Sequence, residues 1–110
     1  MLDVRLYMAQ RLSAMVMVPL TLGHIAVMIY AIQGGLSSAE ILGRTQGSVA
    51  WMLFYGMFVM AVSVHAAIGL RVIVHETLGL GGRALDAFTW IVGVLLLSTG
   101  LNAVAAVTLS

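Results

Sequence analysis

The chain of 110 residues contains no cysteine, and arginine supplies all five basic side chains because lysine is also absent. Without cysteine the chain can form no disulfide, no thiolate metal site and no iron–sulfur cluster of its own. Only 8% of its residues are charged and the formal net charge is +1. This weak charge excludes a nucleic-acid partner.

Apolar residues make up 62% of the sequence, and its mean hydropathy is +1.11. A soluble domain of this length has too little interior to bury so much apolar surface. The composition therefore indicates a membrane protein, with the lipid bilayer as its surroundings.

Three apolar stretches reach the ~20 residues that a membrane-spanning helix needs. These stretches are residues 12–32, 49–74 and 87–109. A Gly/Ser-rich loop at 33–38 and a short polar stretch up to residue 48 separate the first two, and a glycine-rich turn at 78–83 separates the last two. We therefore predict an all-α membrane protein with three transmembrane helices in a single domain over residues 1–110.

The arginines predict the orientation of these helices. Arg5, Arg11, Arg71 and Arg83 fall on one side of the predicted spans, and only Arg44 falls on the other. Because basic residues concentrate in cytoplasmic segments, the N-terminus and the second turn are expected in the cytoplasm. The expected location is the inner (cytoplasmic) membrane of the cell, crossed several times.

His65 lies deep in the second apolar stretch, and Gly69 follows it one helical turn later. An imidazole in hydrocarbon is costly, so it needs a partner. One interpretation is ligation of haem iron, with the missing side chain at Gly69 leaving room for a flat porphyrin. The other is a hydrogen bond to a neighbouring helix.

Arg71 and His75 share one face of the same predicted helix, and Glu76 stands at its end. Arg71 is ~9 Å from His65 along the axis, a distance at which a cation can meet haem propionates. The alternative for Arg71 is an extended side chain that reaches lipid phosphate. His75 and Glu76 are candidates for a proton relay or for a solvated helix end.

Two further sites are open to more than one interpretation. Tyr7, Arg11 and Ser13 place two hydroxyls and a cation at the start of the first span, where a polar head group could dock. The alternative is that Arg11 is only the positive residue with which most first spans start. His24 lies ~20 Å deeper than Arg11 along that helix and at a different depth from His65, so it is a poor opposite ligand for the same haem. Its alternatives are a second haem or a hydrogen bond to a partner helix.

Two motifs resemble the cytochrome b-type membrane anchors of succinate dehydrogenases and fumarate reductases. Residues 11–14, Arg-Leu-Ser-Ala, are similar to the family's Arg-x-Ser-Gly, with Ala14 in place of glycine. The run from His65 through Gly69 and Arg71 is similar to the family's His-x3-Gly-x-Arg, and an acid also ends this helix. The length and the three-span layout agree as well.

The resemblance implies that His65 is one axial ligand of the iron of a b-type haem, with the other histidine donated by a second anchor chain. It implies that Arg11 lies near the haem propionates and the head group of ubiquinone or menaquinone. Arg71 and His75 are further propionate candidates. The family's quinone-contacting serine aligns with Tyr7, and its histidine before the arginine is replaced by Gln10.

The resemblance also implies a place in electron transport from the tricarboxylic acid cycle. The chain would be a non-catalytic subunit that attaches an FAD-binding flavoprotein and an iron–sulfur subunit to the membrane, in a larger helical bundle with the partner anchor. Electrons from succinate would reach quinone beside it. The alternatives are a small membrane transporter or channel subunit, and a structural anchor without haem.

Overall fold

The computed structural model describes residues 3–109, and these fold into four helices. They are α1 (Val4–Gly34), α2 (Ser38–Thr45), α3 (Val49–Leu78) and α4 (Gly82–Thr108). Three of them, α1, α3 and α4, are long and apolar enough to cross a membrane. Residues 3–109 contain no strand, so the predicted all-α class with three long apolar helices is confirmed.

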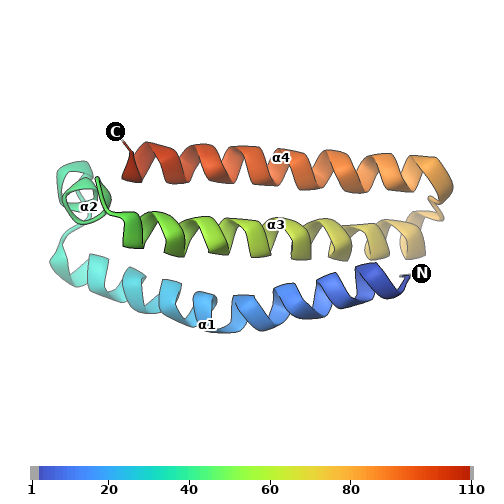
Figure 1. Cartoon of the computed structure of the whole chain (residues 1–110), viewed down its shortest axis with the longest axis horizontal. Helices are drawn as coiled ribbons and strands as arrows, with labels where there is room; N and C mark the ends of the chain where they lie inside the picture. The colour runs from blue at the N-terminus through green and yellow to red at the C-terminus, as the bar shows by residue number, and fades with distance from the viewer. Residues whose placement is uncertain (1–2, 110) are drawn as a thin grey trace.

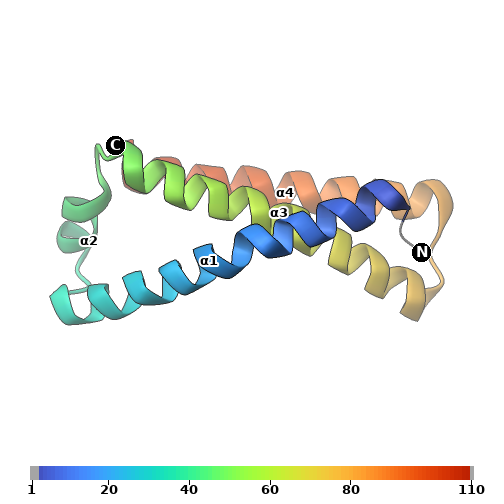
Figure 2. The ribbon, with the colours of Figure 1, turned by 60° about the horizontal axis from the view of Figure 1, so that its bottom comes forward.

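The long helices form an elongated bundle in which α3 lies between α1 and α4 (Figure 1). The three long helices alternate in direction along the bundle, so the start of α1 and the α3–α4 turn share one end. The short helix α2 and the C-terminus share the other. Turning the view shows α1 crossing α3 obliquely (Figure 2). The bundle therefore has α3 as its central helix, and candidate site residues on α3 can contact either neighbour.

Capping residues mark where the long helices begin and end. The carboxylate of Asp3 accepts a hydrogen bond of 2.9 Å from the backbone N–H of Leu6, so α1 begins well before residue 12. Ser48 accepts one of 3.2 Å from the N–H of Trp51 at the start of α3. Gly79 ends α3 with φ 71°, a left-handed conformation that glycine adopts without strain.

The connection between the first two long helices contains a helix where the sequence predicted only a loop and a polar stretch. Ser37 and Glu40 cap the start of α2 reciprocally: the Ser37 hydroxyl accepts from the Glu40 N–H at 3.2 Å, and the Ser37 N–H donates to the Glu40 carboxylate at 3.1 Å. At its other end, the buried Thr45 hydroxyl donates to the carbonyl of Val107 at 2.7 Å. This helix therefore holds the end of α4.

Small residues bring α3 and α4 close together. A Cβ placed on Gly93 would lie 3.6 Å from the Cβ of Ala67, which is ordinary contact. A Cβ placed on Gly100 would lie 2.5 Å from Cγ1 of Val59, which is too close for two carbon atoms. The absent side chain at Gly100 therefore allows the two helices to approach, as small residues do in membrane bundles.

Candidate functional site

His65 on α3 faces the first helix, where it meets Ser13. The Nδ1 atom of His65 and the Ser13 hydroxyl oxygen are 3.4 Å apart. Ser13 is 7% exposed, and its hydroxyl donates a hydrogen bond of 2.9 Å to the carbonyl of Gln10 one turn earlier in α1. The described residues 3–109 give the Nε2 atom of His65 no hydrogen bond. One ring nitrogen of a half-buried imidazole is therefore available to a ligand.

The turn of α3 after His65 also packs against α1. A Cβ placed on Gly69 would lie 3.6 Å from Nε2 of the Gln10 side chain. The amide oxygen of Gln10 is buried and has no hydrogen-bond partner among the described residues. An unpaired buried acceptor is costly, so this oxygen is open to a hydrogen-bond donor.

Tyr7 and Arg11 lie together on an exposed face of α1. The guanidinium of Arg11 donates a hydrogen bond of 3.3 Å to the phenol oxygen of Tyr7, and its central carbon stands 5.7 Å from the ring centroid. Ser13 faces His65 instead of this pair. Of the three predicted quinone contacts, the structure thus brings two together and turns the third toward the histidine.

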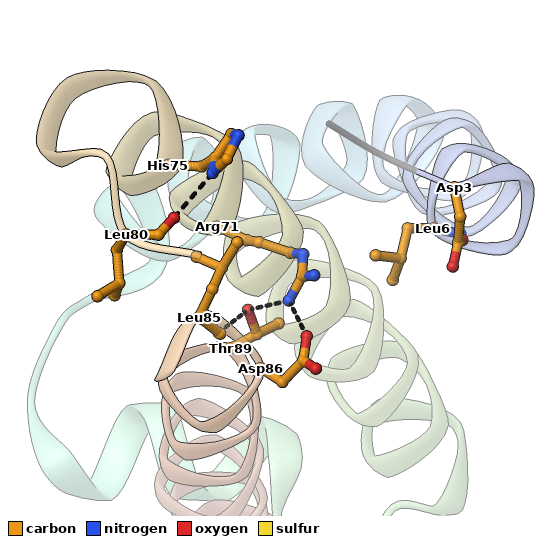
Figure 3. A network of polar contacts seen from close by, with 8 residues as sticks. All are labelled: Asp3, Leu6, Arg71, His75, Leu80, Leu85, Asp86 and Thr89. Atoms are coloured by element: carbon orange, nitrogen blue, oxygen red, sulfur yellow. Dashed lines mark hydrogen bonds and ion pairs between the residues drawn. The ribbon is translucent and has the colours of Figure 1, made fainter. Parts of the chain in front are cut away.

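Arg71 turns toward α4 instead of sharing the direction of His65. Its guanidinium lies 2.8 Å from the carboxylate of Asp86 and donates to the Thr89 hydroxyl at 3.1 Å (Figure 3). The side chain of Arg71 is only 16% exposed, and its Nε atom is buried without a hydrogen-bond partner among residues 3–109. The sequence alone did not identify Asp86 as the partner of Arg71. The available signal is an acidic residue near the start of α4, which runs antiparallel to α3.

His75 lies at the end of α3, away from His65. Its Nδ1 atom is 2.7 Å from the carbonyl oxygen of Leu80 in the turn that leads to α4 (Figure 3). A carbonyl only accepts, so Nδ1 carries the proton. His75 therefore stabilises the α3–α4 turn. The neighbouring Glu76 is exposed.

A groove of about 510 Å³ opens between the start of α1 and the facing halves of α3 and α4. Arg5, Arg71 and Asp86 are among the charged residues that line it, whereas Val64, Ala67 and other apolar side chains line the remainder. The groove therefore combines a charged end with an apolar trough.

His24 occupies a separate aromatic environment in the other half of α1. Its ring centroid lies 5.2 Å from that of Phe58 and 6.3 Å from that of Tyr55, and its buried Nδ1 has no hydrogen-bond partner among the described residues. Phe58 and Tyr55 precede His65 by seven and ten residues, or ~10–15 Å along α3. The two histidines therefore lie at different levels, and residues 3–109 hold no group of three or more metal-ligating side chains.

The comparison with family models concerns almost the whole chain. The model of the succinate dehydrogenase/fumarate reductase transmembrane subunit matches residues 1–105. The chain belongs to this family. Searches of curated proteins and of solved structures gave no match. Membership in the family fits the three apolar helices and assigns the chain to the membrane part of such a complex.

Proposed function

We propose that this succinate dehydrogenase/fumarate reductase transmembrane subunit binds a b-type haem through His65 and forms part of a quinone site. The observation that carries the proposal is the half-buried imidazole of His65, whose Nε2 atom has no hydrogen-bond partner within the described residues. In the interior of a bundle, such a nitrogen is a ready ligand for haem iron.

The residues around His65 fit a haem in two respects. Its Nδ1 atom has the Ser13 oxygen as a partner, as the second nitrogen of a ligating histidine usually does. The neighbouring Gly69 presents no side chain. A bound haem would store and release single electrons. A second histidine ligand would come from a partner anchor chain.

Arg11 and Tyr7 are the proposed quinone contacts of this chain. The exposed guanidinium would donate hydrogen bonds to a quinone carbonyl, and the phenol would hold it in place or donate a proton. Ser13 is the weakest of the three quinone candidates because it is buried against His65. The positive end of the bundle, with Arg5, Arg11, Arg71 and Arg83, is proposed to face the cytoplasm.

Arg11 is also the favoured contact for the haem propionates. The exposed Arg11 guanidinium has no ion-pair partner among residues 3–109, whereas Arg71 is paired with Asp86 and His75 contacts Leu80. Arg71 and His75 therefore serve this role only if they change partners. His24 stays a candidate ligand for a second haem, because its buried Nδ1 is unpaired among the described residues.

The proposed partners are a second membrane anchor, an iron–sulfur subunit and an FAD-binding flavoprotein. This chain contributes no dicarboxylate chemistry, and without cysteine it holds no iron–sulfur cluster. Its own residues bind and orient the redox groups between the soluble subunits and the quinone. The proposed location is the inner (cytoplasmic) membrane of the cell.

Gentle purification through a tag on this chain tests the proposal. We expect the two soluble redox subunits to be recovered with it, and a dithionite-reduced minus oxidised spectrum with the α-band of a b-type haem. Partners without the band would identify an anchor without haem. Recovery of a homo-oligomer with neither would contradict the proposal and favour the transporter alternative.

A further inference from the structure

We infer that Ser13 is a positioning residue for His65: its hydroxyl oxygen accepts the Nδ1 proton, which sets the tautomer and the orientation of the ring. The inference rests on the proposed function, because it concerns a haem held through Nε2. It gives Ser13 a different role from the quinone contact that the sequence predicts.

The direction of the hydrogen bond follows from the other contact of Ser13. A serine hydroxyl has one proton, and here it is donated to the Gln10 carbonyl, 2.9 Å away. The carbonyl is an acceptor only, so in this bond the serine is the donor. At 3.4 Å from Nδ1 the serine oxygen therefore acts as an acceptor, and the proton between the two atoms belongs to His65.

The position of this proton determines whether Nε2 can bind iron. A neutral imidazole has one protonated and one unprotonated nitrogen. With the proton on Nδ1, the lone pair lies on Nε2, which is the atom free to bind iron. A hydrogen bond from Nδ1–H also raises the basicity of the ligating nitrogen and holds the plane of the ring.

The surroundings of Ser13 suit this role better than quinone binding. Ser13 is 7% exposed, in contrast to Tyr7 and Arg11, which stand on an open face of α1. The Gln10 carbonyl belongs to the same helix, so it holds the hydroxyl in a fixed direction independently of any ligand. The serine is therefore a preset acceptor on α1 for a histidine on α3.

Substitution of Ser13 in the assembled complex tests the inference through the haem itself. In Ser13→Ala we expect the midpoint potential of the haem to rise, because a less basic histidine stabilises the oxidised iron less. We also expect the largest g-value of the oxidised haem in electron paramagnetic resonance to shift as the ring becomes free to turn. Ser13→Thr retains a hydroxyl, so its midpoint potential and g-value should stay close to those of the unmodified complex.

Ser63→Ala is the matched control, because Ser63 is 4% exposed on α3 two residues before His65 and lines the groove, whereas the hydrogen-bond partner of His65 is Ser13. It should leave the potential and the g-value unchanged. If Ser13→Ala does not assemble, Ser13→Cys provides the measurement, since a thiol is a weaker acceptor of similar shape and should raise the potential as well.

Potentials and g-values in Ser13→Ala or Ser13→Cys equal to those of the unmodified complex would overturn the inference. Equal shifts in Ser63→Ala would also overturn it, because the effect would then reflect general packing. A His65→Ala variant separates this failure from that of the proposed function. If His65→Ala retains a normal haem, the ligand assignment fails; if it loses the haem while Ser13→Ala changes nothing, only the role of Ser13 fails.

Discussion

The guanidinium of Arg71 on α3 lies 2.8 Å from the carboxylate of Asp86 on α4, and this ion pair joins the two helices beside the turn that connects them. Asp86 is 61% exposed, so its surroundings screen the pair. We predict that Asp86→Asn lowers the free energy of unfolding by only about 1 kcal/mol.

Arg71→Ala should cost more than Asp86→Asn, because it also removes the bond to Thr89 and leaves a gap where the arginine stem is buried. Thermal unfolding of the purified complex in detergent measures both. Glu76→Gln, at an exposed acid of the same end, is the control. An Asp86→Asn variant less stable than Arg71→Ala would contradict the account.

Gly100 is a point of very close approach between α3 and α4. Because a Cβ at this position would fall 2.5 Å from Cγ1 of Val59, Gly100→Ala must push the helices apart, at a cost of about 1–3 kcal/mol. Valine is stiff about its first side-chain torsion and cannot easily move aside. Thermal unfolding should show the loss, and Val59→Ala should restore part of it.

Gly56→Ala is the control for this prediction, because no atom lies within 4 Å of a Cβ at Gly56. In a helix interior alanine is the more favourable residue, so this variant should match or exceed the unmodified chain in stability. A Gly100→Ala variant as stable as Gly56→Ala would mean that the helices are not in close contact there.

Arg11 should be needed for quinone reduction and not for succinate oxidation. Replacement by alanine removes the proposed hydrogen-bond donor, and we expect quinone reduction to fall by at least tenfold, which corresponds to about 1.4 kcal/mol of lost transition-state stabilisation. Succinate oxidation with an artificial acceptor should be unchanged. Arg5→Ala is the control, since Arg5 is an exposed arginine of the same helix end. Normal quinone reduction in Arg11→Ala would exclude this assignment.

The capping box of α2 gives a prediction about pH. The backbone N–H and the hydroxyl of Ser37 hold the pKa of the Glu40 carboxyl below its ordinary 4.5. A lowered folded-state pKa means that the carboxylate contributes stability above its unfolded pKa, and the contribution is lost as pH falls through the folded pKa. Carbon NMR of labelled Glu40 should show titration below 4.5, moving upward in Ser37→Ala. Titration at or above the ordinary value in the unmodified chain would refute the cap.

The apolar helices were predictable because length and composition alone define a membrane span. The helix α2 was missed because Gly34, Gly35 and the serines around it are typical of a loop. Its signal was nevertheless present: Ser37 followed three residues later by Glu40 is the sequence pattern of a capping box.

The directions of the site residues were harder to predict, because helices that are apolar on every face do not indicate which face meets which neighbour. Helical spacing separated Arg71 from His65, but only the packing of α3 against α4 reveals Asp86 as its partner. In the same way, the sequence grouped Ser13 with Arg11, whereas the crossing of α1 and α3 turns it to His65.

The central claim is that His65 binds haem iron, and the reduced minus oxidised spectrum of His65→Ala in the purified complex tests it most directly. His24→Ala is the comparison, because it removes an imidazole of the same bundle at another level. We predict that the b-type α-band is lost in His65→Ala while the soluble subunits stay attached, and that a band persists in His24→Ala. An unchanged band in His65→Ala would contradict the account.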